Sequence, residues 1–581
     1  VLHVPLLSAE FSRPLFLKLL CAGLVRLSRR TQKRHLDGIS SGQKGMTYVL
    51  ENFVGSVGEE IEIRHSLPKM ACWYFLKGNP RRGHQGVAGR LAEHRREWLS
   101  PSEVMDEVSA QADLTKHQSL QLVRDMVSSG LLVEQMRYSD GSYVEGIALP
   151  YQRFSDHLVA RHLLASHLDV RTETSLRRSF YSNRRLGAVF SIDRSSRSFA
   201  EPGLASALMV EFPERAKKWG IGADLPELLD YLPRKRRLFY PIANAFIEGL
   251  YWRDATSFGS GTAQIVRVLL KRKDSEIANR LMEVLLGIAA RREHPWNGAW
   301  LWSRLASMEM PHRDLMWSEF IRCSEESSNV SRLLAWAERP AASKADAAVL
   351  SNQLKLLALM TTTTERLVRD RATRAMVLLS ESQPRALFEL AIQSLEFNDP
   401  YVSERVLAAA YGVALRNWGL VRRSPDFDSS LKVLARELLT SVLEVGAPHS
   451  TWHTLTRSYA EGIVQVLGML NSRLVHPKDL ASLLTAKARS IWISATIRWV
   501  DLSMNAAIMT WTIWNTWVCG DRSLIGSVDS AIARLISSTS TKSLPDTQRA
   551  AVTGIAATGT GRSTHGLLIL RCMGLGAVLG V

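Results

Sequence analysis

The chain has 581 residues, of which 46% are hydrophobic and 22% charged, and it carries a formal net charge of +17. This composition is typical of a globular protein and excludes an intrinsically disordered chain. The length allows three or four domains, or fewer domains with a repeat array. The charge favours a polyanionic partner, either nucleic acid or an acidic protein face, although runs of like charge are as often only solvated helix faces.

The five cysteines have no paired spacing, which excludes a disulfide framework or a Cys-x-x-Cys metal site and indicates a reducing compartment. No signal-peptide pattern is visible, and the most apolar segments, 6–24 and 490–514, are interrupted by charged residues. We therefore expect a cytoplasmic protein with no membrane partner. Because the chain opens with Val1 and not Met, we expect a truncated start. The glycine-rich apolar tail is unlike the rest of the chain, and a shifted reading frame is a separate hypothesis for it.

The first region, 1–85, is predicted to be helical. Pro14 suits the first turn of an amphipathic helix with the sequence PLFLKLLCAGLVRL. A second helix is predicted over 46–63, and the glycine- and arginine-rich segment 78–86 is predicted to be a polar loop.

The next region, 86–168, is predicted to contain three helices and a β-hairpin. The second helix has Ser100 or Ser102 as its N-cap, and Gly130 ends the third. Two strands then flank Asp140-Gly141, a strong two-residue hairpin signal. This order is typical of a winged-helix domain.

A strand-to-helix junction at 149–168 ends that region. The segment 144–151 has strand character, and Ser155 is the predicted N-cap of the following helix. The residues predicted to share one helical face are Phe154, Leu158, Ala165 and Leu168.

The region 169–345 is predicted to be a helical linker or sensor region, broken at the strings PGL, FPER, LPRKRR and REHPWNG. Its tryptophans, Trp296, Trp300 and Trp302, are predicted to pack in the core and not to form a stacking platform.

A repeat occupies 346–475. Each of three arginine-bearing helices, 366–379, 399–415 and 454–470, follows another helix and carries small and apolar residues at helical spacing. The residues predicted to face the neighbouring helices are Val368, Ala372, Ala375 and Leu379; Val402, Val406, Ala409 and Val413; and Leu455, Tyr459, Ile463 and Val466. This pattern is typical of a HEAT-like solenoid.

Charged pairs on these repeat helices, Asp370/Arg371 and Glu404/Arg405, are predicted to form contacts between repeats. A further helical region with an atypical tail is predicted at 476–581. The sequence thus predicts a mainly α protein, with a winged-helix domain followed by a HEAT-like α-helical solenoid.

Catalytic motifs are not evident. The sequence has no Gly-x-x-x-x-Gly-Lys-Ser/Thr phosphate loop, no His-Glu-x-x-His and no Gly-x-Ser-x-Gly elbow. His157, His162 and His167 recur every five residues, which winds around a helix and cannot place all three on one metal ion. Catalysis by residues of this chain alone is not expected.

Several strings together resemble one family. SRPLFLKLLCAGL resembles the helix that follows the nucleotide-binding core in bacterial STAND NTPases (NACHT-like, antiviral Avs-type relatives), and PYQRFSDHLVARHLL resembles the element that closes their winged helix. RLVRDRATRAMVLL, DPYVSERVLAAAYGVAL and HTLTRSYAEGIV resemble their downstream helical repeats. The similarity is patchy, runs from about Arg13 to Leu470, and keeps the family's order. It places 1–85 as the helical tail of the NTPase module.

The resemblance implies a signalling ATPase whose ATP/ADP state controls self-oligomerisation, and whose helical C-terminal region senses a protein trigger, often from a phage. This chain lacks the Walker motifs, so ATPase activity is expected only together with an upstream core. By position, Arg153 and Asp156 match the junction where the wider family contacts the ADP phosphate. The alternative is that Arg153 caps a strand end and Asp156 lies in the first turn of the helix.

A second hypothesis is a non-catalytic, basic HEAT and winged-helix protein that binds nucleic acid or acts as a scaffold. The net charge and the helix KHQSLQLVRDMVSSG, in the recognition position, favour it. That helix has only Lys116, His117 and Arg124 as basic groups and an apolar face, so it resembles an interior element more than a groove reader.

Overall fold

The computed structural model describes residues 5, 7, 11, 13–45, 47–79, 83–112, 114–139, 141–193, 198–229, 235–271, 274–420, 424–444 and 446–470. Over these residues the chain is mainly helical, as predicted, and the strands form a two-stranded antiparallel sheet. The chain divides into two compact units, Val1–Glu365 (unit 1) and Arg366–Val581 (unit 2). In the described ranges, no helix combines the length and apolarity that a membrane crossing needs. The predicted region 476–581 lies outside the described residues.

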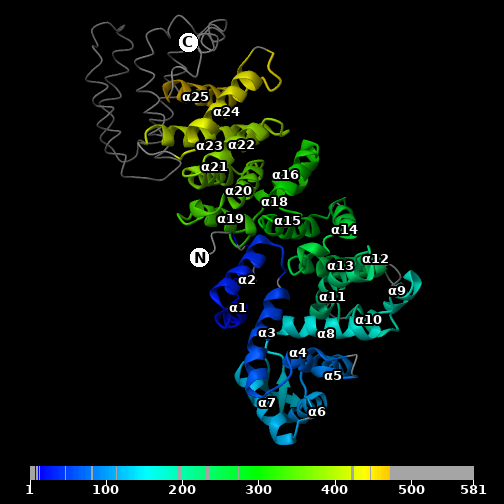
Figure 1. Ribbon diagram of the computed structural model, residues 1–581. Helices are drawn as coiled ribbons and strands as arrows, with labels where there is room; N and C mark the ends of the chain where they lie inside the picture. The colour runs from blue at the N-terminus through cyan, green and yellow to red at the C-terminus, as the bar shows by residue number, and fades with distance from the viewer. Residues whose placement is uncertain are drawn as a thin grey trace, which may run out of the picture. The chain divides into compact units, whose positions relative to one another are not determined.

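Unit 1 begins with four helices, coloured blue in Figure 1: α1 (Pro14–Val25), α2 (Arg29–Ser41), α3 (Thr47–Arg64) and α4 (Ala71–Lys77). The helix begun by Pro14 and the helix predicted over 46–63 are confirmed as α1 and α3. The α3 helix packs against both α1 and α4, and it buries Phe53, Val57 and Ile61.

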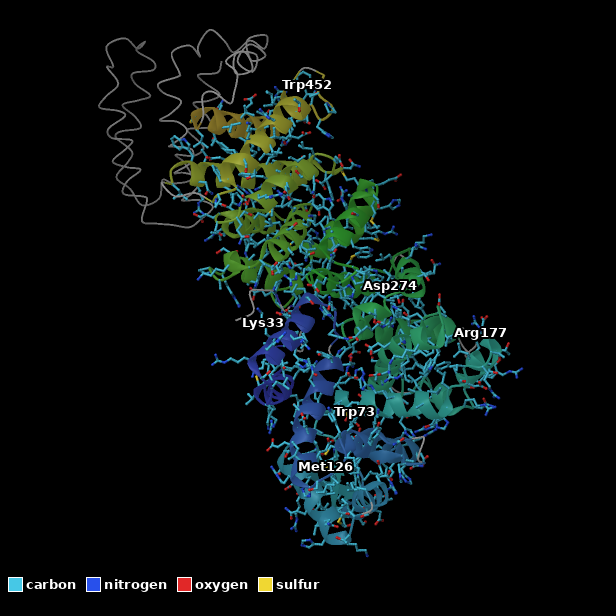
Figure 2. The ribbon with its side chains drawn as sticks, viewed as in Figure 1. Lys33, Trp73, Met126, Arg177, Asp274 and Trp452 are labelled. Carbon is cyan, nitrogen blue, oxygen red and sulfur yellow. The ribbon has the colours of Figure 1, made fainter. Side chains whose placement is uncertain are left out.

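The three-helix-and-hairpin module follows. It consists of α5 (Gly86–His94), α6 (Pro101–Ala112), α7 (Lys116–Ser128), β1 (Val133–Ser139) and β2 (Ser142–Ala148). The predicted hairpin is confirmed: Ser139 pairs with Ser142, and Gly141 has the positive φ (+87°) that a two-residue turn needs. Met126 of α7 lies in the interior of the module and is fully buried (Figure 2).

Local signals in this module were predicted correctly. Ser100 and Glu103 form reciprocal bonds, because the Glu103 amide donates to Ser100 Oγ and the Ser100 amide donates to Glu103 Oε2. Gly130, with φ of +77°, follows the end of α7. The backbones of Leu99 and Ile147 exchange hydrogen bonds of 2.9 and 2.8 Å, which tie the segment before α6 to β2.

The α8 helix (Gln152–His167) connects this module to the rest of unit 1 (Figure 1, cyan). It packs against α4 and α5 on one side and against α11 on another. The helices that follow it in unit 1 are α9 (Glu173–Ser179), α10 (Arg185–Ala188), α11 (Pro202–Ala216), α12 (Leu225–Leu228), α13 (Lys235–Leu250), α14 (Ser260–Lys271), α15 (Ser275–Ala289), α16 (Gly298–Ala306), α17 (Met310–Arg313), α18 (Glu319–Arg322), α19 (Asn329–Ala337) and α20 (Ala347–Met360).

The break predicted at PGL is confirmed, because α10 ends at Ala188 and Pro202 occupies the first position of α11. The break predicted at FPER is wrong. FPER lies inside α11, which continues through Pro213 to Ala216. The break at REHPWNG is confirmed between α15 and α16. There Trp296 is buried and stacks on Trp300 at 4.9 Å, in agreement with the predicted core packing.

Unit 2 is an array of paired helices: α21 (Arg366–Ser380), α22 (Arg385–Ser394), α23 (Pro400–Trp418), α24 (Phe427–Leu438) and α25 (Thr454–Leu470). The odd-numbered helices pack in succession, α21 on α23 and α23 on α25, and α22 packs on α24. Ala375 and Ala409 are fully buried, and this lets the helices approach closely.

The predicted contact between charged residues of this array is confirmed for one pair. Arg405 Nη1 of α23 lies 2.6 Å from Asp370 Oδ1 of α21. The predicted face of the last helix is wrong at Leu455, which is exposed, whereas Tyr459 is half-buried and its ring lies 6.2 Å from that of Tyr411 on α23. The buried face starts instead at Thr456 and Ala460, one residue further along, since α25 packs on both α23 and α24.

Candidate functional site

The α8 helix carries both residues that the sequence singled out. It begins at Gln152, with Tyr151 as its N-cap in an extended conformation. Ser155 is therefore not the N-cap, as predicted, but lies inside the helix, where its amide donates to the Tyr151 carbonyl at 3.0 Å. The physical reason is Pro150, which ends β-type pairing and leaves the chain free to turn into a helix directly after Tyr151.

The apolar face of α8 is broader than predicted. Phe154 and Leu158 are buried, as expected, but Ala165 is exposed, and Leu168 lies beyond the helix end and is half-buried. Leu163 and Leu164 are buried as well. Because α8 packs against helices on more than one side, a single apolar stripe does not describe it.

Arg153 docks α8 onto α13. Its Nη1 donates to Glu248 Oε1 at 2.7 Å, and its guanidinium lies 4.9 Å from the centre of the Trp252 ring. The Arg153 side chain is only 12% exposed. Glu248 also accepts a hydrogen bond from Ser206 Oγ on α11. Arg153 is the second residue of the helix, so the alternative that it caps a strand end is wrong.

Asp156 lies one helical turn after Arg153 and packs against the start of α11. A Cβ atom at Gly203 would lie 2.2 Å from Asp156 Oδ2, so any larger residue there would displace the carboxylate. Gln152 Nε2 donates to Asp156 Oδ1 at 3.2 Å. Burial raises the pKa of Asp156 to about 6. Asp156 is the fifth residue of α8, so the alternative that placed it in the first turn is also wrong.

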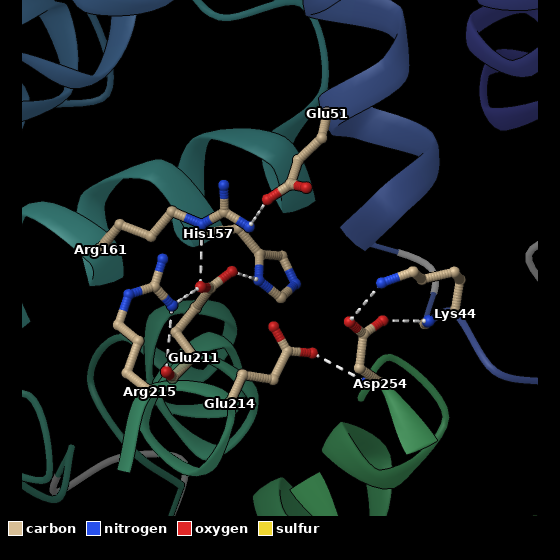
Figure 3. A network of polar contacts seen from close by, with 9 residues as sticks. Lys44, Glu51, His157, Arg161, Glu211, Glu214, Arg215 and Asp254 are labelled. Atoms are coloured by element: carbon tan, nitrogen blue, oxygen red, sulfur yellow. Dashed lines mark hydrogen bonds and ion pairs between the residues drawn. The ribbon is translucent and has the colours of Figure 1, made fainter. Parts of the chain in front are cut away.

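A cluster of buried charges lies on the next turns of α8 (Figure 3), and we call it the Glu211 network. Glu211 of α11 is fully buried, and its two carboxylate oxygens contact three side chains. His157 Nδ1 lies 2.8 Å from Oε1, Arg161 Nε donates to Oε2 at 2.8 Å, and Arg215 Nη1 also contacts Oε2. Burial by itself would raise the pKa of Glu211, but Arg161, Arg215 and His157 hold it well below its usual range.

His157 belongs to this network as a neutral imidazole. It is 2% exposed, and burial lowers its pKa. A neutral ring donates its Nδ1 hydrogen to the ionised Glu211 carboxylate. The Trp252 ring lies 5.2 Å from the imidazole, so His157 and Arg153 contact the same tryptophan from α8.

A second carboxylate extends the network toward the N-terminal helices. Glu214 accepts the backbone amide of Asp254 at 2.9 Å, and Asp254 in turn accepts the Gly45 amide at 2.6 Å and lies 3.5 Å from Lys44 Nζ. Burial, together with the charges of Glu211 and Asp254, raises the pKa of Glu214 to about 8. Glu214 is therefore largely protonated at neutral pH.

Glu51 completes the arrangement from α3, with Oε1 at 2.7 Å from Arg161 Nη2. The network thus ties α3, α8 and α11 to the segments around Lys44 and Asp254. Such an arrangement positions helices and balances charge. In the described ranges, no group of His, Cys, Asp and Glu side chains could hold a metal ion.

The structure brings Arg153 and Asp156 to the side of α8 that meets α11 and α13. The sequence did not point to Glu211, the centre of the buried network. Glu211 interrupts the apolar run LMVEF in α11, and a charge in such a run was a usable signal. Its partners His157 and Arg161 lie 54 and 50 residues away in the sequence. No local pattern relates residues at that separation.

Comparison of the chain with protein-family models, with curated proteins and with solved structures finds no match.

Proposed function

We propose that this chain is the regulatory and sensor part of a STAND-type signalling NTPase that acts in antiphage defence. In this proposal the three-helix-and-hairpin module is a winged-helix domain, and the paired helices of unit 2 belong to a HEAT-like solenoid that binds a protein trigger. Support comes from the order of these parts and from the QRFSDH string, which forms the start of α8.

The observation that carries the proposal is the position of α8. This helix packs against α4 and α5 on one side and α11 on another, and its arginines are bound by carboxylates of α3, α11 and α13. A displacement of the module would therefore move α8 and disturb the buried ion pairs between α8 and α11, because such pairs tolerate little misalignment. Such an element suits a relay between a nucleotide-dependent core and a sensor.

ATP or ADP would be bound mainly by an upstream core, with Arg153 and Asp156 at the sensing junction. Arg153 is bound to Glu248, a side chain that is 51% exposed, so a phosphate group has to compete with this carboxylate. The bidentate fork of arginine suits such an exchange of partners.

The coding sequence upstream of Val1 tests the proposal directly, since we expect it to contain a phosphate loop within a few hundred codons. In the complete protein, Arg153→Met is expected to change ADP retention and trigger-dependent self-oligomerisation, measured by nucleotide release and light scattering. No phosphate loop upstream, or unchanged ADP retention in a folded variant, would contradict the proposal.

The alternative, a basic nucleic-acid-binding or scaffold protein, is favoured by one surface. Helix α2 exposes four cations at helical spacing, namely Arg29, Arg30, Lys33 and Arg34. On α7, Lys116 and Arg124 are exposed, but Asp125 is bound by Arg64 and His65 from α3, which occupies part of that helix's surface. A salt titration of duplex binding tests the nucleic-acid-binding function, and absence of binding at low salt rules that function out.

A further inference from the structure

A pocket of about 420 Å³ lies in unit 1 between α3, α4, α8 and α11. Figure 2 marks its position by Trp73, where α4 meets α8. The side chains that decide its chemistry are Glu51, Met70, Trp73, Lys77, Arg161 and Arg215. A volume of this size suits a small organic molecule.

Lys77, the last residue of α4, is the cation of this pocket that has no carboxylate partner. Its Nζ lies 5.4 Å from the Trp73 ring centre and 5.3 Å from that of Tyr74. Within the part of the chain that the structure describes, no carboxylate lies at ion-pair distance from it. Burial, Arg161 and Arg215 together lower the pKa of Lys77.

The two arginines of the pocket are neutralised but retain free donors. Arg161 uses Nε and Nη2 for Glu211 and Glu51, and Arg215 uses Nη1 for Glu211. These contacts leave Nη1 of Arg161 and the Nε and Nη2 atoms of Arg215 available. Two arginines are thus balanced by two carboxylates, and Lys77 adds an excess positive charge.

Beside these charged groups, His162 lines the pocket and the other walls are mainly apolar. Met70 and the Trp73 ring provide a flat hydrophobic surface, with the Arg161 guanidinium 5.7 Å from the ring centre. A ligand with a planar apolar part and an anionic group would contact this surface and pair with Lys77 at the same time.

We propose that this pocket binds a small organic phosphate monoester with an aromatic part, whose phosphate pairs with Lys77 and accepts hydrogen bonds from Arg161 and Arg215. Guanidinium groups and an ammonium together suit a dianionic phosphate. The site lies apart from the contacts of Arg153 with Glu248 and Trp252, and the inference does not depend on the proposed function.

Pyridoxal 5′-phosphate, an aromatic phosphate with an aldehyde, tests the site in the full chain. The Lys77 amine adds to the aldehyde and water leaves to form an imine, which borohydride reduces to a stable secondary amine that mass spectrometry locates. We expect Lys77 to react about tenfold faster than the exposed Lys18 of α1, because Arg161 and Arg215 hold the phosphate in the pocket and keep the aldehyde close to the Lys77 amine.

Two comparisons separate binding from simple reactivity. Inorganic phosphate should protect Lys77 and not Lys18, and pyridoxal without its phosphate should lose most of the preference for Lys77. Equal labelling of both lysines, or labelling of Lys77 that phosphate does not reduce, overturns the proposal.

A direct binding measurement uses phenyl phosphate and isothermal titration calorimetry. Lys77→Met removes the charge, keeps an unbranched side chain one heavy atom shorter, and is expected to weaken binding about tenfold or more. Lys18→Met is the matched control and should bind as the unmodified chain does. Equal affinity of the Lys77→Met variant, or no binding to the unmodified chain, contradicts the proposal.

Discussion

Units 1 and 2 are both helical, yet their interiors differ in the use of charge. In unit 1, Glu211 is fully buried and accepts hydrogen bonds from two arginines and a histidine. Arg253 is also fully buried and pairs with Asp224. In unit 2, Glu404 is buried beside Arg405, the Arg405–Asp370 pair retains about a fifth of its side-chain surface, and most of the buried centre is alanine, valine and leucine.

This difference has a physical consequence. A buried charge must find a particular partner, so it fixes one arrangement of helices and is costly to disturb. Small and aliphatic residues pack against any suitable neighbour, so an array of helix pairs can tolerate gradual change. We therefore expect unit 1 to hold one arrangement of its helices more strictly than unit 2 does.

The largest expected effect is that of Glu211→Gln. Loss of the carboxylate charge leaves Arg215 and Arg161 with less compensation in a buried site, which costs about 3–5 kcal/mol of the stability of unit 1. Pulse proteolysis in urea, with fragments assigned to each unit by mass spectrometry, measures the two units separately. Arg385→Gln, on an exposed pair in unit 2, is the control and should change little. An equal effect of both variants would contradict the comparison.

Asp156→Asn tests a buried acid whose ionisation destabilises the fold. The pKa of Asp156 is raised from 3.8 to about 6, so the folded state favours the protonated form. Its contribution to stability is complete below pH 4 and is lost as pH rises through 6. The variant should match the unmodified chain near pH 4 and exceed it by about 2–3 kcal/mol at pH 8. Urea unfolding at both pH values measures this difference, and a gain that is the same at both would refute the assignment.

Much of the fold followed from local patterns in the sequence. The capping pair Ser100/Glu103, the turn at Gly141 and the helix begun by Pro14 each depend on residues within one turn of each other. The contact between Arg405 and Asp370 was also predictable, because the helices repeat.

The candidate site could be predicted only in part. The resemblance points to Arg153 and Asp156 at the junction, and their role there stays a prediction. The local capping rule predicts Ser155 as the N-cap, because a serine there could accept a hydrogen bond from the first turn. The helix starts earlier, since tertiary packing and not the best cap decides its first turn. Glu211 and Lys77 were missed because their environment is created by helices distant in the sequence.

The close contact between α23 and α25 in unit 2 can be tested by Gly462→Ala, with a smaller expected loss of stability. A Cβ atom at this position of α25 would lie 2.6 Å from the Tyr411 ring of α23, so the helices or the ring must shift. We expect a loss of about 1–2 kcal/mol in unit 2. Gly55→Ala is the matched control in unit 1, because no atom lies within 4 Å of its Cβ position. It should stabilise α3 by about 0.5–1 kcal/mol through lower backbone entropy.

The smallest expected effect concerns the contact between α21 and α23. A double-mutant cycle of Arg405→Met and Asp370→Asn should give a coupling energy of about 1 kcal/mol, because the pair is only partly buried. Urea unfolding of unit 2 measures it. A coupling as large as the effect of Glu211→Gln would show that the two units use charge alike.

Hydrogen–deuterium exchange of the full chain tests most directly the claim that buried charge makes the α8 junction of unit 1 distinct from unit 2. In the Glu211→Gln variant, we expect faster amide exchange in α8 and α11, and unchanged exchange in α21, α23 and α25. Equal acceleration in both units, or unchanged exchange in α8 and α11, would contradict the account.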